Sequence, residues 1–195
     1  MTDSASKRQH EIIASAGKLL MEKGIKGLTT KNLAQEMGFS ESALYRHFTN
    51  KEDIVVLLLQ HLASSMKTRL DAIAQSEATA TAKLTTVFNS QFRFFYENPH
   101  YVVSILSEGL FDESEKINLA IMQLVNYKTK LIANLFEEGK QQKEFKLELT
   151  TADMVHITVG CFRMMMLKWK FSQFQIDLIQ QGNAIMATNF NLMKA

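Results

Sequence analysis

The sequence contains few of the residues that support cross-linked or membrane-spanning structures. Its 195 residues include one cysteine, Cys161, which excludes an internal disulfide framework and is compatible with a reducing compartment. The longest apolar stretch, 155–167, is interrupted by His156 and Arg163 and is shorter than the roughly 20 residues of a membrane helix. The first eleven residues are polar apart from Met1 and Ala5, which is unlike a signal peptide. We therefore expect a soluble, cytoplasmic protein that does not enter a membrane.

Sequence motifs of enzymes are also missing. There is no glycine-rich phosphate loop, nucleophile elbow or zinc-protease helix. The five histidines are scattered through the sequence: His10, His47, His61, His100 and His156. Cys161 follows His156 by five residues, which places the two on different faces of a helix and argues against a shared zinc ion. We expect no catalytic residues, no metal and no cofactor.

The charge balance gives no global sign of nucleic-acid binding. The formal net charge is +2, from 22 basic and 20 acidic residues, so any basic footprint has to be local. Residues 1–51 contain eight lysines or arginines and five acidic residues. This difference is a mild bias toward basic residues at the N-terminal end.

Apolar residues recur at helical spacing along nearly the whole chain. With 46% hydrophobic residues the chain can form a substantial core. The longest strand-like alternation is Phe145–Leu149, whereas breaks in the helical pattern fall at Gly24, Asn98–Pro99 and Gly139. Four residue pairs are spaced like helix caps: Asn50 with Asp53, Asp112 with Glu115, Thr150 with Asp153, and Ser172 with Gln175. The pattern predicts an all-α protein of about nine helices.

The segment 29–51 has the pattern of two short helices joined by a tight turn. Thr30 is expected to cap the first helix, and Ser40 the second. Gly38 lies where the first helix must stop, at a position that suits a left-handed backbone. The connection of three residues between them is the length that a helix-turn-helix requires.

This segment resembles the DNA-binding motif of TetR-family transcriptional regulators. The matches run in order without a gap: Thr30, Leu33, Ala34, Gly38, Ser40, Leu44, Tyr45, Phe48 and Lys51. The resemblance implies an N-terminal three-helix DNA-binding headpiece at residues 1–50. It also implies a helical ligand-binding and dimerisation domain at residues 51–195.

The resemblance also implies which residues contact double-stranded DNA. They are Thr30, Lys31, Ser42, Ala43, Tyr45, Arg46, His47 and Lys51. Hydroxyl and ammonium groups suit phosphate oxygens, and an arginine in the recognition helix can read guanine. A core position for Tyr45 is the alternative reading, while Leu44 and Phe48 are expected to be core residues.

An effector pocket is expected in the middle of the chain, also by resemblance. The residues assigned to it are Phe88, Gln91, Phe92, Phe95, Leu106, Met122, Val125, Phe162 and Met166. Eleven methionines and thirteen phenylalanines favour an apolar, adaptable interior that suits a hydrophobic ligand. The same side chains at helical spacing can equally form an ordinary core.

The last two helices are expected to form a homodimer interface as half of a four-helix bundle. The residues assigned to it are Val155, Val159, Phe162, Ile179, Gly182, Met186 and Phe190. Gly160 and Gly182 are unfavourable inside helices unless close packing uses them. A monomer core is the alternative explanation of this pattern.

The resemblance to TetR-family regulators implies a one-component repressor that binds a palindromic operator as a homodimer and is released by a small hydrophobic effector. One alternative is a DNA-bound interaction protein without such an effector, like the family member that blocks cell division over the chromosome. Another is a helical ligand-binding or enzymatic protein that no longer binds DNA.

Overall fold

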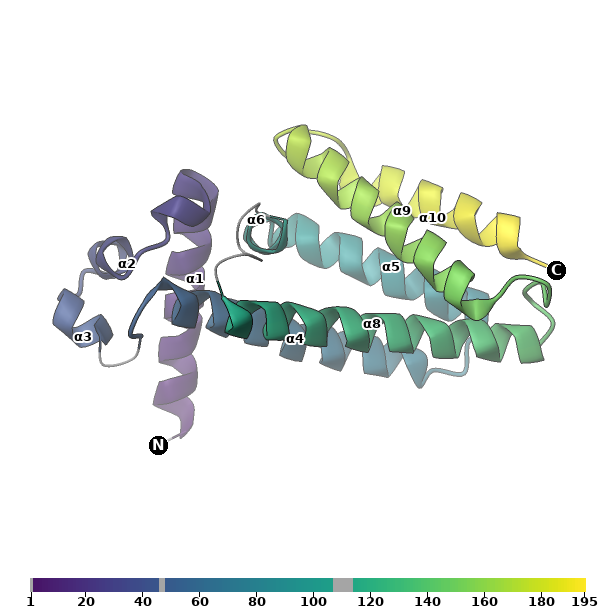
Figure 1. Ribbon diagram of the computed structural model, residues 1–195, viewed down its shortest axis with the longest axis horizontal. Coiled ribbons are helices and arrows are strands. Elements are labelled where there is room, and N and C mark those ends of the chain that lie inside the picture. The colour runs from purple at the N-terminus through teal and green to yellow at the C-terminus, as the bar shows by residue number, and fades with distance from the viewer. Residues whose placement is uncertain (1, 46–47, 107–113) are drawn as a thin grey trace. The chain divides into compact units, whose positions relative to one another are not determined.

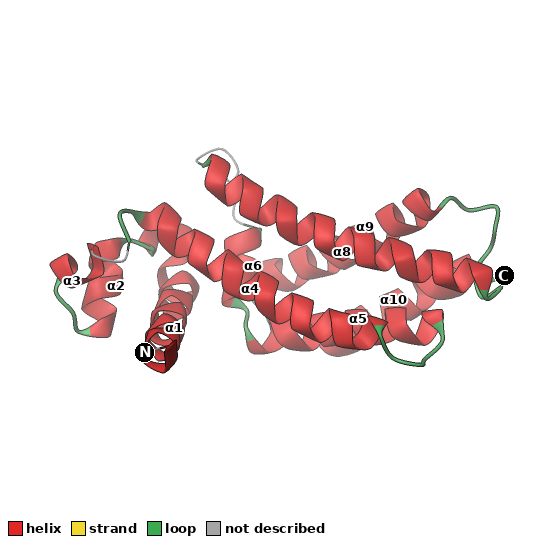
Figure 2. Cartoon of the chain, turned by 90° about the horizontal axis from the view of Figure 1, so that it is seen from below, coloured by secondary structure: helices red, strands yellow, loops and turns green. Residues whose placement is uncertain are grey.

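The computed structural model describes residues 2–45, 48–106 and 114–195, with side chains from Arg8 onward. This part of the chain is all-α, as predicted, and contains nine helices and no strand (Figures 1 and 2). The helices are α1 (Thr2–Gly27), α2 (Thr30–Met37), α3 (Glu41–Tyr45), α4 (Lys51–Ala74), α5 (Ala80–Glu97), α6 (His100–Ile105), α8 (Glu115–Gln141), α9 (Thr151–Phe171) and α10 (Leu178–Met193). Within the described ranges, no helix is both long and apolar enough to cross a membrane.

The chain packs into two compact units. The first comprises residues 1–63 and 99–122, and the second comprises residues 64–98 and 123–195. The chain passes from the first unit to the second inside α4, which continues without interruption from Lys51 to Ala74. The predicted functional division after residue 50 concerns DNA and ligand binding, and it stays a prediction.

Polar side chains define where several helices begin. The backbone N–H of Asp53 donates to Asn50 Oδ1 at 3.1 Å, and that of Asp153 donates to Thr150 Oγ1 at 3.1 Å. These two predicted caps are confirmed. The predicted cap at Ser172 was wrong, because α10 begins later than expected, and Asp177 Oδ1 accepts from the N–H of Gln180 at its start. Asp112 of the remaining predicted cap lies outside the described residues.

The first unit is built around α1. Its predicted apolar stripe is buried, namely Ile12, Ile13, Ala16, Leu19 and Leu20. The helix extends to Gly27, but the backbone of Gly24 is non-helical, with φ 63° and ψ −170°, so the predicted break at Gly24 is present as a kink. Gly17 allows the His100 ring to approach closely. A Cβ atom added at this position would lie 3.0 Å from the Cγ atom of His100.

Three histidines lie close together in the first unit. The rings of His10 and His61 meet edge to face, with centroids 5.4 Å apart. Burial, and secondarily the charge of His61, lowers the pKa of His100 to about 4. Its Nε2 atom is buried without a hydrogen-bond partner among the described residues. The fold therefore holds His100 in its neutral form near pH 7.

The second unit packs α5, α9 and α10 together. Helix α10 lies beside both α9 and α5 (Figure 1). At Gly182 of α10 the Phe92 ring of α5 comes within 2.7 Å of the place that a Cβ atom would occupy. Gly160 of α9, by contrast, has no atom within 4 Å of that place. Close packing inside the chain therefore explains the glycine in α10 but not the one in α9.

This difference yields a paired prediction for two alanine substitutions. Gly182→Ala should destabilise the fold by about 1–3 kcal/mol, because the added methyl collides with an enclosed aromatic ring. Gly160→Ala should stabilise it by roughly 0.5–1 kcal/mol, because alanine is the better helix former and has room. Thermal and urea unfolding of both variants measures the effect. Equal changes in the two variants would contradict this packing.

A second prediction concerns acid stability. The pKa of His100 is lower in the fold than the 6.5 of an ordinary histidine, so the unfolded chain binds more protons between about pH 6.5 and 4. Stability should therefore fall as the pH drops through this window. A full pKa unit corresponds to about 1.4 kcal/mol, and partial exposure reduces the expected loss to on the order of 1–2 kcal/mol.

His100→Phe keeps a ring at this position and removes the titration, so its stability should depend less on pH in that window. His156→Gln is the matched control, because His156 is exposed on α9. Urea unfolding at pH 7 and pH 4.5 tests both variants. A wild-type pH dependence unchanged by His100→Phe would rule out this role of the buried histidine.

Candidate functional site

The turn between α2 and α3 has the geometry of a helix-turn-helix. Gly38 ends α2 in the left-handed conformation, with φ 68° and ψ 30°. The N–H of Phe39 donates to the carbonyl oxygen of Ala34 at 2.8 Å and closes the end of the helix. Ser40 then caps α3, since its Oγ accepts from the N–H of Ala43 at 3.3 Å. These two sequence interpretations, of Gly38 and of Ser40, are confirmed.

The predicted capping role of Thr30 was wrong by one residue. Thr29 is the cap, because its Oγ1 accepts from the N–H of Asn32 at 3.1 Å. Thr30 is instead the first residue of α2 and is 8% exposed. Its hydroxyl donates to the hydroxyl of Tyr45 in α3 at 3.2 Å. Adjacent threonines can each cap a helix, and the sequence pattern alone does not distinguish them.

The other residues assigned to DNA differ in how far they are open to solvent. Lys31 and Ser42 are exposed, Ala43 and Lys51 are half-buried, and Tyr45 is 52% exposed. Arg46 and His47 lie outside the described residues. Because Tyr45 accepts a hydrogen bond from Thr30, its own hydroxyl proton remains available to an acceptor such as a phosphate oxygen.

Two contacts beside this motif were not apparent from the sequence. The Arg8 guanidinium lies 3.9 Å from the centroid of the Phe39 ring. Lys18 pairs with Glu36 at 2.6 Å, and this hydrogen bond raises the pKa of Lys18. The contacts tie α1 to α2 and to the turn after it, through partners too distant in sequence for helical periodicity to reveal.

Four of the residues assigned to the effector pocket form one aromatic cluster. The Phe162 ring of α9 lies 5.6 Å, 5.3 Å and 6.2 Å from the rings of Phe88, Phe92 and Phe95 in α5. All four side chains are buried, and Phe88 and Phe92 have no exposed surface. The cluster forms an apolar interior for the second unit.

The remaining residues of that assignment are dispersed. Gln91 is buried and accepts from the guanidinium of Arg69 at 3.2 Å, and Met166 is also buried. Leu106 ends α6 in the first unit. Met122 and Val125 on α8 are 52% and 39% exposed. Of these, Val125 lines an open groove.

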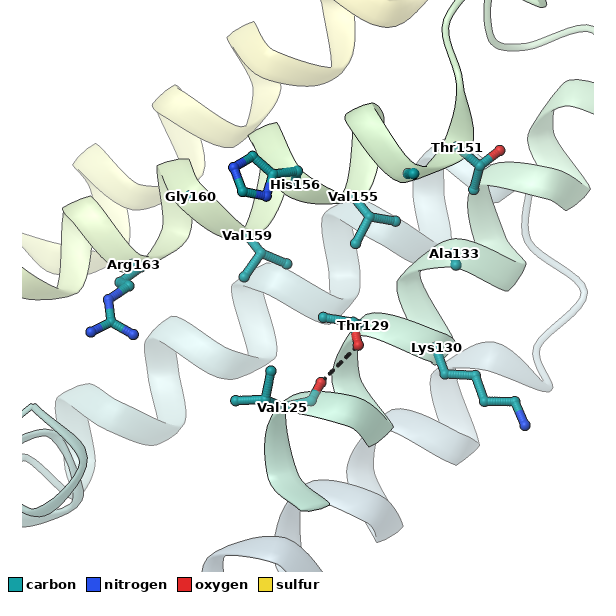
Figure 3. Close-up of a pocket in the computed structure, with 11 residues that line it drawn as sticks. Val125, Thr129, Lys130, Ala133, Thr151, Val155, His156, Val159, Gly160 and Arg163 are labelled. Atoms are coloured by element: carbon teal, nitrogen blue, oxygen red, sulfur yellow. Dashed lines mark hydrogen bonds between the residues drawn. The ribbon is translucent and has the colours of Figure 1, made fainter. Parts of the chain in front are cut away.

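This groove runs between α8 and α9 and has a volume of about 730 Å³ (Figure 3). Its lining includes Val125, Ala133, Val155 and Val159 as apolar walls, with Lys130, His156 and Arg163 as basic side chains. No aspartate or glutamate lines it among the described residues. The groove was not apparent from the sequence, because periodicity within α8 and within α9 does not specify how the two helices pack against each other.

Five of the residues assigned to the dimer interface are buried inside the chain: Val155, Phe162, Gly182, Met186 and Phe190. Val159 and Ile179 are half-buried. The large apolar side chains that remain exposed on α9 and α10 lie elsewhere: Ile157, Met164, Phe171, Ile185 and Leu192. Met164 and Ile185 line a shared groove of about 460 Å³ between the two helices.

Two family models match the chain. The model of the tetR family of bacterial regulatory proteins matches residues 12–58, which include the whole helix-turn-helix. The model of the C-terminal region of YsiA-like proteins matches residues 57–190. Together they cover nearly all of the described chain.

Related sequences include nucleoid occlusion factors named SlmA. The factor of Marinomonas sp. is 27% identical over 124 residues, which are 64% of this chain and 63% of that protein. The factor of Escherichia coli O1:K1 is 31% identical over 118 residues, or 60% of each chain. The chain therefore spans less than two thirds of either relative.

Solved structures with the same fold include regulators of fatty acid metabolism. FadR from Bacillus subtilis in complex with stearoyl-CoA superposes with a TM-score of 0.81 at 19% identity, covering 93% of this chain and 97% of that chain. A TetR transcription regulator from Haloarcula marismortui gives a TM-score of 0.83 at 17% identity, covering 97% of this chain and 100% of that chain. These likenesses concern the fold.

Proposed function

The chain belongs to the tetR family of bacterial regulatory proteins, and we propose that it is a homodimeric repressor that binds a palindromic operator. The family consists of DNA-binding transcription regulators and not of enzymes. The observation that carries the proposal is the helix-turn-helix at α2 and α3, which coincides with the family match. DNA binding would belong to residues 1–50, and dimerisation and ligand binding to residues 51–195.

The proposed DNA contacts are the residues of this motif that the family resemblance assigns to DNA. Lys31 and Lys51 would meet phosphates, as would the free proton of the Tyr45 hydroxyl. Ser42, Ala43, Arg46 and His47 of the recognition segment would face the major groove, and Thr30 would support them by holding Tyr45. Two such headpieces on a two-fold axis match the two halves of a palindrome.

The proposed release mechanism is a coupling of two binding equilibria. A hydrophobic effector would bind in the second unit and favour a headpiece spacing that no longer fits two successive major grooves. Support comes from FadR of Bacillus subtilis, which has this fold and was solved with stearoyl-CoA. A long acyl chain is therefore the first effector to test.

A second candidate is a nucleoid-occlusion factor, which the SlmA relatives favour. Such a protein would bind many dispersed chromosomal sites in the cytoplasm and act through a protein partner. Mapping bound sites across the genome separates the two functions. Binding at a few promoter sites that is lost when an acyl effector is added would support the repressor. Binding at many sites that the effector does not change would support the nucleoid-occlusion factor.

The DNA-binding prediction is tested by selecting bound duplexes from a random pool with the purified chain, which should yield a palindrome. Lys31→Ala should then lower the slope of log affinity against log salt by about one phosphate contact. Lys194→Ala makes the same charge change in the exposed C-terminal residues and should leave the slope unchanged. Tyr45→Phe should weaken binding through loss of the hydroxyl alone. No enriched sequence at low salt would refute DNA binding.

The dimer prediction uses the apolar face that α9 and α10 leave exposed. Met164, which is 65% exposed, would become buried against the second copy, so Met164→Glu would enclose an unpaired charge. We expect the dimer to weaken more than tenfold, with a matching loss of operator affinity. Leu147→Glu is the control, because Leu147 is 72% exposed outside these helices. Sedimentation measures the mass, and a Met164→Glu dimer as stable as wild type would disprove this interface.

A further inference from the structure

Three of the five histidines of the chain meet at one contact between helices of the first unit. His10 belongs to α1, His61 to α4 and His100 to α6. The rings of His10 and His61 lie edge to face with centroids 5.4 Å apart, and His61 is near enough to His100 for its charge to act on that ring. The contact therefore gathers three side chains of the type that ordinarily changes its charge between pH 5 and 8.

The His100 ring is packed closely against the backbone of α1. A Cβ atom added at Gly17 would lie 3.0–3.2 Å from the Cγ, Cδ2 and Nδ1 atoms of His100. The ring of Tyr101 lies 4.3 Å from the His100 ring between centroids, and Nε2 of His100 is buried without a hydrogen-bond partner among the described residues. A charged imidazole needs solvent or a partner at this atom. Protonation of His100 is therefore favourable only when the helices around it separate.

Within the described part of the chain, the charges that act on His61 and His100 are all positive. His10 acts on His61, and His61 acts on His100. Burial is the larger cause at both positions, and together with these charges it lowers the pKa of His61 and lowers that of His100 to about 4. The hydroxyl of Tyr101 stays neutral, because burial raises its pKa to about 12. Each proton that the cluster takes up therefore makes the packed arrangement less favourable.

The helices that carry these histidines also support the helix-turn-helix. Helix α1 packs against both α6 and α2, and Lys18 of α1 pairs with Glu36 of α2 at 2.6 Å. Helix α4 begins at Lys51, directly after the motif. A separation of α6 from α1 and α4 therefore alters the support on which α2 and α3 rest.

We propose that His10, His61 and His100 form a pH-sensitive switch, in which acid charges the cluster, separates α6 from α1 and α4, and releases the operator without a small-molecule effector. This inference rests on the proposed operator binding and adds a form of regulation to it. Because the pKa of His100 is lower in the packed state than the 6.5 of an ordinary histidine, the open state binds more protons and gains population as the pH falls from about 6.5 toward 4. At pH 5 the equilibrium should shift on the order of tenfold, after allowance for partial exposure of the ring.

The first test measures the affinity of the full-length chain for its selected operator duplex between pH 7 and pH 5, at constant ionic strength. Affinity should fall at least fivefold over this range. Protonation of His47 in the recognition segment would act in the opposite direction, because added positive charge strengthens attraction to phosphates. The His47→Gln variant removes that opposing effect and should show a fall at least as large. An affinity that stays constant or rises toward pH 5 in both proteins would overturn the switch.

The second test identifies the residues. The double variant His61→Gln with His100→Phe cannot be charged at these two positions, so it should bind the operator at pH 7 and lose most of the fall toward pH 5. His156→Gln, at an exposed histidine of α9, is the matched control and should keep the wild-type profile. His61→Lys places a lasting positive charge in the cluster and should weaken operator binding at pH 7 about as much as acid weakens it in the wild type, with helix content unchanged by circular dichroism. A double variant with the wild-type profile would contradict the proposal.

The third test separates a local switch from general acid unfolding by amide hydrogen exchange without DNA. After correction for the intrinsic exchange rate, the amides of α1 and α6 should lose protection at pH 5, whereas those of α5, α9 and α10 should keep it. The double variant should keep protection in all five helices. An equal loss in both units of the wild type would reduce the effect to acid denaturation and would overturn the switch.

Failure of this inference is distinguishable from failure of the proposed function. If the chain binds its operator at pH 7 but the pH profile does not depend on His61 and His100, the repressor stands and the switch is refuted. If no operator is bound at pH 7, the proposed function itself is wrong, and with it the release of DNA by acid. Hydrogen exchange then still decides whether acid separates α6 from α1.

Discussion

The left-handed backbone at Gly38 is the constraint on which the DNA-binding part of this protein depends. With φ at 68°, a side chain at this position would strain the turn. The turn lets α2 end and α3 begin within three residues, and it brings Thr30 of one helix to Tyr45 of the other. A shallower turn would separate these two hydroxyls and displace the groups that are proposed to face DNA. The identity of one small residue thus determines the geometry of a whole recognition element.

Much of the fold was predictable because its signals are local. Caps such as Asn50 and Thr150, and the break at Asn98–Pro99, involve residues within one turn of each other. The start of α10 was misplaced because several polar residues precede it, and only the backbone geometry selects Asp177. The groove between α8 and α9 was not predictable, since its lining residues are brought together by packing between two helices.

Helix α9 illustrates why residue assignments within an apolar helix are hard to make from spacing. Phe162 and Met166 point into the core, Val159 lines the groove beside α8, and Met164 remains exposed toward a second groove. A helix that is apolar around most of its circumference shows no single stripe. The same periodicity therefore fits a core, a ligand wall and a contact between subunits. Only burial in the folded chain separates these roles.

The continuity of α4 has a mechanical consequence. A helix of 24 residues is about 36 Å long at ~1.5 Å per residue, and no proline or glycine interrupts its hydrogen-bonded ladder. Such an element behaves as a stiff rod, so a shift at residues 64–74 is transmitted to residues 51–63 as rotation or sliding and is not absorbed by backbone torsions. In the proposed release mechanism, the structural change would then come from side chains that repack at the two ends of α4. Any coupling along α4 would therefore require the helix to move as a rigid body.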